Sequence, residues 1–190
     1  MKVLQGIVAL KHFYLAGETA LALHYGHRIS ADLDCFTPRV FESSEILDEL
    51  NQYHAIGVWA LSRNSLTLSL DVVKVDFIRH DYPLIKPAAV VDVVRIASPE
   101  DIGAMKLNSI ANRGAKKDFF DLHELLRYFS LSALLGFYKE KYSQSEWAIA
   151  LKSLTYFDDA DLEPDPVSIR KISWKQVKED VSNCVRSFGL

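Results

Sequence analysis

Two aspartates, Asp32 and Asp34, stand one residue apart at the start of a short segment that runs into Cys35 and Phe36. If residues 32–36 form a strand, successive side chains alternate between its faces, so both carboxylates point the same way, roughly 7 Å apart. Burying two like charges side by side is costly unless a cation lies between them. Mg²⁺ prefers oxygen ligands and commonly binds between a few carboxylates and substrate phosphates, so Mg²⁺, or Mn²⁺, is the expected cation.

A glycine turn precedes these aspartates. The apolar run from Phe13 to Ala16 leads into Gly17, and a helix is expected from Thr19 onward. A glycine turn at a helix N-terminus presents backbone N–H groups, which form a natural binding place for phosphate. Metal-binding carboxylates beside a phosphate-binding turn are the arrangement that nucleotidyl transfer needs.

The stretch from Leu15 to Asp34, LAGETALALHYGHRISADLD, resembles the first motif of the AbiEii/AbiGii-type nucleotidyltransferases. These are toxins of type IV toxin–antitoxin and abortive-infection systems, within the polymerase-β-like superfamily. The resemblance implies an α+β fold, with a mixed-sheet nucleotidyltransferase core followed by a C-terminal helical half. The family pattern has Gly-Gly or Gly-Ser before the helix, whereas Glu18 follows Gly17 here. A carboxylate at that position would face the triphosphate unless it turns outward or helps to hold metal.

Transfer of the polymerase type needs a third carboxylate from a neighbouring strand, so that two metal ions can lie about 3.5–4 Å apart. Asp76 is the candidate, because it interrupts an apolar strand expected over residues 71–79. By itself, an aspartate in a strand is more often an edge or solvent-facing residue. Together with Asp32 and Asp34, and because the family places an aspartate in this strand, Asp76 is interpreted as a metal ligand.

A local basic patch follows later in the chain. From Gly103 to Lys117 every charged residue is basic. On a helix, Lys106 and Arg113 lie seven residues apart and therefore share one face. Such a pair is usually a solvated helix face, but it could also neutralise a triphosphate. This segment resembles the later motif of the same family, which favours nucleotide binding and, for Lys106, a part in catalysis.

Several nearby residues admit two interpretations. Arg28 and Ser30 could contact phosphate or a metal-bound water, while Ser30 could also simply fix the turn. Asp118 either orients the basic pair or caps the second helix of the C-terminal half. Asp121 is expected to be structural. His27 is expected to serve a helix end, with a role as a titrating base as the alternative.

The composition limits which kinds of binding partner are expected. The chain has 190 residues, 49% of them apolar, and a net charge of −3, so any contact with nucleic acid has to be local. The two cysteines fit no zinc or redox spacing. No signal peptide and no apolar stretch of membrane-spanning length are recognisable, so a cytoplasmic location without a membrane partner is expected.

The layout is predicted as an N-terminal α/β core over residues 1–97 and a helical region over residues 98–190. Residues 1–12 are expected to form a short helix or turn. Further expected elements follow hydrophobic periodicity and turn residues. The first is a helix over 43–52, which Ser43 or Ser44 is expected to cap. The β-rich part is expected to hold a hairpin of strands 57–63 and 66–70, strand 71–79 and an extended segment over 90–97. The remaining expected elements are helices from 98 to 113, 118 to 129, 131 to 142, 143 to 156 and 174 to 188, and a loop over 158–166.

The prediction is a Mg²⁺-dependent enzyme that moves a nucleoside monophosphate from an NTP to an acceptor. The resemblance implies RNA, tRNA in particular, as acceptor and an antitoxin protein as partner. The metal ligands are Asp32, Asp34 and Asp76, and the nucleotide-binding residues are Gly17, Glu18, Thr19, Arg28, Ser30, Lys106, Arg113 and Asp118. Two alternatives stay open: a binding module whose catalysis is weakened by Glu18, and a metal-dependent nuclease that uses the same aspartates.

Overall fold

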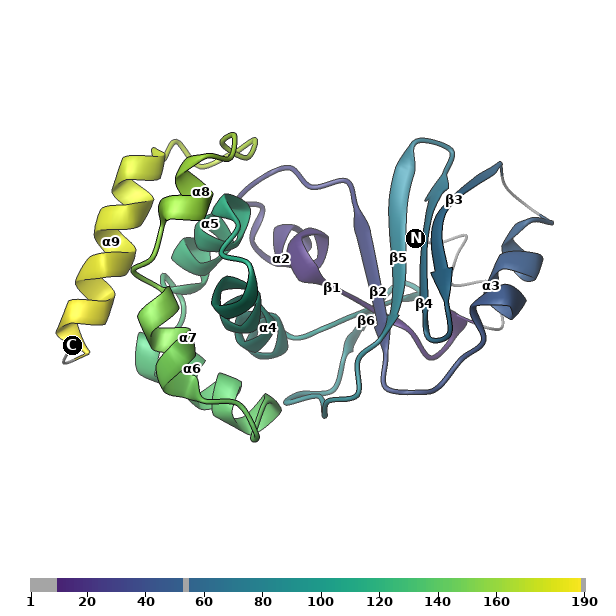
Figure 1. The fold of residues 1–190 in the computed structure, drawn as a ribbon, viewed down its shortest axis with the longest axis horizontal. Helices are drawn as coiled ribbons and strands as arrows, with labels where there is room; N and C mark the ends of the chain where they lie inside the picture. Colours follow the sequence, from purple (N-terminus) through teal and green to yellow (C-terminus); the bar gives the residue numbers. More distant parts are fainter. Residues whose placement is uncertain (1–9, 53–54, 189–190) are drawn as a thin grey trace. The chain divides into compact units, whose positions relative to one another are not determined.

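The computed structural model describes residues 10–52 and 55–188, and their contacts divide the chain into two compact units (Figure 1). Unit 1 takes the chain up to Ala20 and again over Ala31–Ser98; unit 2 takes Leu21–Ser30 and the chain from Pro99 onward. The predicted domain boundary at residue 97 stays a prediction. Most of the element expected over residues 1–12 lies outside the described residues.

Unit 1 is built on a seven-stranded mixed sheet of order β3-β4-β5-β2-β1-β7-β6. Strands β2 and β5 pair in parallel, as do β1 and β7, and the remaining neighbours are antiparallel. The α+β fold class with a mixed sheet is confirmed. The strands are β1 (Tyr14–Ala16), β2 (Leu33–Thr37), β3 (Ile56–Ser62), β4 (Ser65–Leu70), β5 (Val73–Arg79), β6 (Ala89–Val91) and β7 (Val94–Ile96).

Residues with a left-handed backbone conformation lie in the turns beside these strands. The expected hairpin is confirmed as β3 and β4, with Asn64 at φ 65° between them. Strand β5 starts two residues later than expected because Asp71, at φ 53°, turns the chain. The segment expected to be extended over 90–97 is instead the hairpin β6–β7, with Asp92 at φ 55°. Asparagine and aspartate tolerate this conformation better than other non-glycine residues, and sequence alternation does not reveal it.

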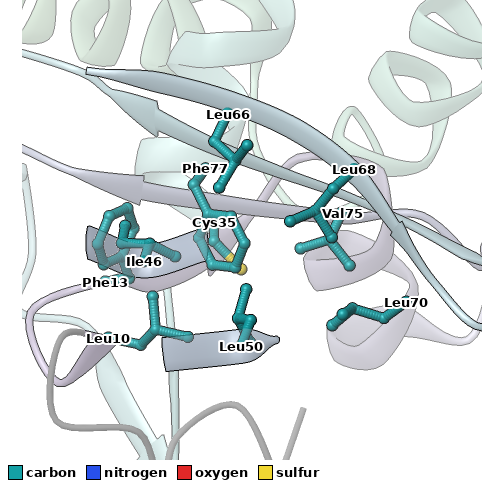
Figure 2. Close-up of a cluster of buried hydrophobic side chains, with 10 residues drawn as sticks. All are labelled: Leu10, Phe13, Cys35, Ile46, Leu50, Leu66, Leu68, Leu70, Val75 and Phe77. Atoms are coloured by element: carbon teal, nitrogen blue, oxygen red, sulfur yellow. The ribbon is translucent and has the colours of Figure 1, made fainter. Parts of the chain in front are cut away.

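Unit 1 contains a core cluster of buried apolar side chains (Figure 2). Strand β4 supplies Leu66, Leu68 and Leu70 at every second position, as the strand period requires. Helix α3 (Ser43–Leu50) adds Ile46 and Leu50. The other members are Leu10, Phe13, Cys35, Val75 and Phe77.

One expected feature of α3 is wrong. Its N-cap is Glu42, which makes no side-chain capping hydrogen bond. Ser43, one of two serines considered for the cap, instead donates its hydroxyl to the carbonyl of Ser62 at 2.6 Å, which ties the helix to the end of β3. The sequence shows the serine but not the strand carbonyl that competes for it.

Unit 2 is helical. Its central helix α4 packs on α5, α6 and α7, while α9 packs on α5. Asp101 of α4 and Lys141 of α6 form a fully buried ion pair at 2.8 Å. The helices are α4 (Pro99–Asn112), α5 (Lys116–Leu125), α6 (Leu131–Lys141), α7 (Trp147–Ser153), α8 (Asp158–Asp161) and α9 (Trp174–Ser187). Helix α2 (Gly17–Tyr25) begins in unit 1 and ends in unit 2.

Most of the helix predictions are confirmed within a few residues. Helix α4 starts at Pro99, and Gly114 follows its end at φ 57°, as a C-terminal glycine should. The loop expected over residues 158–166 is wrong in its first part, because Asp158–Asp161 forms the single turn α8. Among the described helices, none combines the length and apolar character needed to cross a membrane.

The Phe77→Ala substitution is expected to lower the free energy of unfolding by about 3–5 kcal/mol, because it leaves a cavity in a closely packed core. Phe77 is fully buried and packs edge-on against Phe13, with ring centroids 5.5 Å apart. Urea unfolding followed by circular dichroism measures the change. The control is Val72→Ala, since Val72 is 97% exposed and its loss should cost less than about 0.5 kcal/mol. Equal effects of the two variants would contradict the proposed core.

Candidate functional site

Two of the predicted metal ligands are neighbours across the sheet of unit 1. Asp34 of β2 is the register partner of Asp76 of β5 in a parallel pair. Adjacent strands lie about 4.8 Å apart, and register partners project to the same face, so backbone pairing brings the two carboxylates together. Asp32 lies one residue before β2 and is half-buried. The sheet thus juxtaposes an aspartate pair that stands 42 residues apart in sequence.

The backbone conformation and the close approach of Asp34 require a glycine at position 17. Its φ is +68°, and a Cβ atom there would lie 2.3 Å from Oδ2 of Asp34, so any larger residue would collide with that carboxylate. The hydroxyl of Thr19 donates to the backbone carbonyl of Asp32. The first turn of α2 is therefore held against the chain that enters β2.

Glu18 lies in the same first turn and is only 8% exposed. A carboxylate is favoured at a helix N-terminus by the exposed N–H groups and the helix dipole. Glu18 thus supplies negative charge at the helix end where the sequence predicted phosphate binding. Ser30, in the loop before Asp32, is half-buried.

The Asp76 carboxylate has two protein partners. It accepts hydrogen bonds from Oγ1 of Thr67 and from Nζ of Lys74, each at 2.6 Å. The pKa of Lys74 is raised above its ordinary 10.5, first by the hydrogen bond to Asp76 and, against the opposing effect of burial, by the negative charges of Asp76, Asp34 and Asp32. Lys74 therefore lies in the field of all three aspartates and shows that the field is negative.

The donor atoms suit a divalent cation. Mg²⁺ is commonly held by one or two carboxylates together with substrate phosphates rather than by an all-protein cage, and Asp34 with Asp76 supplies such a pair. No group of three or more His, Cys, Asp or Glu side chains able to hold a metal occurs within the described ranges. A metal role for Asp32, Asp34 and Asp76 as a set stays a prediction, and the cation would compete with Lys74 for Asp76.

Unit 2 holds the predicted basic pair by a shared carboxylate. Lys106 Nζ lies 2.9 Å from Oδ1 of Asp118, and Arg113 Nε lies 3.0 Å from Oδ2. Lys106 and Asp118 are buried, whereas the Arg113 side chain is 57% exposed. Of the two interpretations of Asp118, orientation of the basic pair is correct and capping is wrong, because the N-cap of α5 is Ala115.

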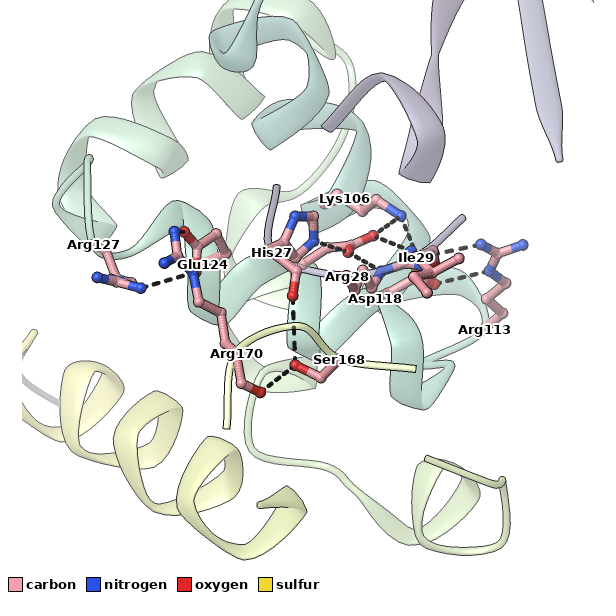
Figure 3. A network of polar contacts seen from close by, with 11 residues as sticks. His27, Arg28, Ile29, Lys106, Arg113, Asp118, Glu124, Arg127, Ser168 and Arg170 are labelled. Atoms are coloured by element: carbon pink, nitrogen blue, oxygen red, sulfur yellow. Dashed lines mark hydrogen bonds and ion pairs between the residues drawn. The ribbon is translucent and has the colours of Figure 1, made fainter. Parts of the chain in front are cut away.

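A second carboxylate, that of Asp121, contacts Lys106, Arg28 and His27, which Figure 3 labels. Its Oδ2 is 2.6 Å from Lys106 Nζ, and both its oxygens receive the guanidinium of Arg28, at 2.6 and 2.9 Å. His27 Nε2 lies 2.7 Å from Oδ1. Asp121 thus joins Lys106 of α4 to the loop after α2. The signal that could have identified it is its spacing of three from Asp118, which places both carboxylates on one face of α5.

The environment fixes the charges of this network. Burial acts to raise the pKa of Asp121, but the charges of Lys106 and Arg28 and the hydrogen bonds from Arg28 and His27 outweigh burial and lower it well below 3.8. Burial acts to lower the pKa of Lys106, but the carboxylates of Asp121 and Asp118 outweigh it and raise that pKa above 10.5. Lys106 therefore stays positively charged, and Asp121 stays negatively charged, at neutral pH.

Comparison with known proteins identifies the family. The profile of the family described as "Nucleotidyl transferase AbiEii toxin, Type IV TA system" matches residues 7–187. The chain belongs to the AbiEii family. It is 36% identical over 197 residues to the protein aq_aa25 of Aquifex aeolicus (strain VF5), covering 96% of both proteins.

Solved structures share the AbiEii fold. The structure of JHP933 from Helicobacter pylori matches with a TM-score of 0.61 at 21% identity, covering 98% of this chain and 88% of that one. The nucleotidyltransferase toxin MenT4 from Mycobacterium tuberculosis H37Rv matches with a TM-score of 0.62 at 12% identity, covering 97% of this chain and 82% of that one. The AbiEii protein described here is accordingly a nucleotidyltransferase of a toxin–antitoxin family, as its first motif indicated.

The Asp121→Asn substitution is expected to lower the free energy of unfolding at pH 7 by about 3–5 kcal/mol, because it leaves the buried Arg28 without its counter-charge and takes from Lys106 one of its two carboxylate partners. The native contribution of Asp121 is fully present above pH 3.8 and is lost as the pH falls below it, since the unfolded carboxyl then takes up a proton first. The difference between native protein and variant should therefore narrow below about pH 4.

Urea unfolding between pH 3 and pH 8 measures this difference, with Asp159→Asn as the control because Asp159 is exposed on α8. A constant difference across this pH range would contradict the assigned ionisation of Asp121.

Proposed function

We propose that this nucleotidyltransferase moves a nucleoside monophosphate from a Mg²⁺-bound NTP to a hydroxyl group of an RNA acceptor. Membership of the AbiEii family supports the reaction class. The observation that carries the proposal is the register pairing of Asp34 with Asp76, which places two carboxylates side by side on one face of the sheet.

In unit 1, Asp32, Asp34 and Asp76 are assigned to the divalent ion. When bound, this ion would supply positive charge to the phosphates of the substrate. The turn at Gly17 and Thr19 is assigned to phosphate, because the left-handed glycine leads directly into the first turn of α2.

In unit 2, Lys106 and Arg113 are assigned to the triphosphate. Arg113 keeps more than half of its side chain exposed while Asp118 fixes one edge of its guanidinium, so a phosphate can reach this positive charge. Arg28, whose guanidinium is held by Asp121, is assigned to positioning that carboxylate. Ser30 keeps its predicted role beside phosphate.

The reaction balances as a substitution at phosphorus. The oxygen of the acceptor hydroxyl forms a new bond to the α-phosphorus, the bond from that phosphorus to the bridging oxygen breaks, and pyrophosphate leaves with the bonding electrons. The hydroxyl proton passes to a carboxylate or to water. The chain contributes position and charge rather than a covalent intermediate.

The proposal also includes an acceptor and a protein partner. A separately encoded antitoxin is proposed because the matching family is described as a type IV toxin–antitoxin family. An RNA acceptor, tRNA in particular, is proposed from the resemblance of the first motif. The cytoplasmic location stays a prediction.

The Asp34→Asn variant is expected to lose nucleotide transfer by roughly 100-fold or more, because a neutral amide cannot provide the charge that the metal site requires. The assay incubates the protein with Mg²⁺, total tRNA and each of the four α-³²P-labelled NTPs. Asp48→Asn is the matched control, since Asp48 is exposed on α3. Label on RNA that survives equally in both variants would overturn the assignment, and absence of transfer by the native protein would overturn RNA as acceptor.

Glu18 is expected to weaken binding of the triphosphate without abolishing it. The Glu18→Gln variant removes one negative charge from the first turn of α2 and should bind NTP about fivefold more tightly, which corresponds to ~1 kcal/mol of repulsion between neighbouring charges in water. Equilibrium dialysis with labelled NTP and Mg²⁺ measures the affinity. Glu45→Gln, which neutralises the first-turn acid of α3, should leave it unchanged. Weaker binding by Glu18→Gln would show that Glu18 helps to hold the substrate.

A further inference from the structure

Unit 2 contains a cavity of about 300 Å³ that the proposed reaction does not use. It lies between the loop after α2, helix α5 and the segment before α9, and all of its lining residues belong to unit 2. Its lining is rich in basic side chains: Arg28, Arg127, Arg170 and Lys171, together with His27 and His123.

The charges of this lining do not cancel. Arg28 is neutralised by Asp121 behind it. The buried carboxylate of Glu124 is shared by Arg127, at 3.3 Å, and by Arg170, at 3.2 Å. One carboxylate facing two guanidinium groups leaves one positive charge in excess.

Lys171 adds a second positive charge, because it is exposed and has no ion-pair partner among residues 10–52 and 55–188. Arg127 and Arg170 remain 49% and 42% exposed, so their guanidinium groups keep donors free to contact a ligand. The cavity therefore has an excess of positive charge that is accessible to an anion.

A buried polar atom in the same lining also lacks a partner. His27 uses Nε2 to contact Asp121 at 2.7 Å, whereas its Nδ1 is buried and has no hydrogen-bond partner within the part of the chain that the structure describes. Buried polar atoms without a partner are rare in folded proteins and call for an explanation. A ligand or water in the adjoining cavity would provide one.

The wall that carries Arg170 is held to the loop after α2 by hydrogen bonds, and Figure 3 shows the Ser168 hydroxyl donating to the carbonyls of His27 and Arg170. The carbonyl of His27 accepts hydrogen bonds from the N–H groups of Ile169 and Arg170, at 2.9 and 3.1 Å, and Ile29 N–H donates to the carbonyl of Val167 at 2.9 Å. The positive charge is thus presented on a segment that is already ordered, which lowers the entropic cost of binding.

We propose that this cavity binds a phosphate ester through Arg127, Arg170 and Lys171. Guanidinium groups match the geometry of phosphate oxygens, and two excess positive charges match the charge of a phosphate monoester or of two adjacent diesters. The volume exceeds that of a bare phosphate and lies at the small end of ligand sites. Phe120 and Ile172 provide apolar wall for the remainder of the ligand.

The phosphate ester has two possible sources, a small phosphorylated molecule or the backbone of a single-stranded RNA. Only the second source rests on the proposed function, because an RNA acceptor would bring backbone phosphates to the enzyme. Binding of the phosphate group itself is independent of the transfer reaction.

The test compares two double variants of the full chain that remove the same charge. Arg127→Gln/Lys171→Gln removes two cations of the cavity, whereas Lys175→Gln/Arg186→Gln removes two exposed cations of α9 that do not line it. Calorimetric titration with inorganic phosphate, with AMP and with a short single-stranded RNA measures affinity. We expect the cavity variant to lose about tenfold in affinity for the bound probe and the α9 variant to match the native protein.

The probes distinguish the sources. Loss of phosphate or AMP binding assigns the site to small phosphate esters. Loss of RNA binding alone assigns it to the polynucleotide backbone, and the slope of log K against log salt should then fall by about 1.4, for two lost contacts on a single strand. Equal binding of every probe by the two variants would overturn the proposal.

A separate measurement distinguishes failure of the cavity proposal from failure of the proposed nucleotidyl transfer. Binding of labelled NTP with Mg²⁺ should be the same in both double variants. Loss of NTP binding in the cavity variant alone would contradict the claim that the cavity is separate from the NTP-binding site. If the native protein transfers no label to RNA, the proposed function fails, whereas the phosphate and AMP titrations still decide the cavity.

Discussion

The buried carboxylate of Asp121 is the interaction on which the helical unit depends. One fully buried anion receives a lysine from α4 and an arginine and a histidine from the loop after α2, so three separate parts of the chain have to meet at one point. Buried ion pairs add little net stability compared with apolar packing, but removal of one partner is costly. The network therefore restricts how the loop and α4 can be arranged. The same restriction holds the ammonium group of Lys106 in one place.

In the sheet of unit 1, by contrast, two like charges are brought together. There the carboxylates of Asp34 and Asp76 are placed side by side by backbone pairing, and Lys74 and Thr67 donate hydrogen bonds to Asp76. Gly17 leaves room for Asp34 because it has no Cβ atom. Negative charge in unit 1 and positive charge in unit 2 are thus each fixed by the fold of their own unit, which is what a reaction governed by position and charge requires.

The cavity of unit 2 extends this pattern to residues outside the family motifs. Arg28 is one of the residues that line the cavity, and its guanidinium donates to Asp121. The loop after α2 therefore takes part in both the network and the cavity. Glu124 lies one turn beyond Asp121 on α5 and forms ion pairs with Arg127 and Arg170. Asp118 likewise forms ion pairs with Lys106 and Arg113. Helix α5 therefore carries three buried acids, Asp118, Asp121 and Glu124, each of which contacts at least one basic side chain from another segment.

The sequence by itself determined the elements and the chemistry near each motif. Alternation in β4, the proline and glycine at the ends of α4, and the Gly17 and Asp32-x-Asp34 motif are local features, so periodicity and side-chain type were sufficient to predict them. Only the tertiary structure decided which side chains meet. The register that pairs Asp34 with Asp76, the strand carbonyl that takes the hydroxyl of Ser43, and the central place of Asp121 all depend on contacts between distant segments. Such contacts are selected by packing and by the cost of burying charge, and neither is encoded in the spacing of residues along the chain.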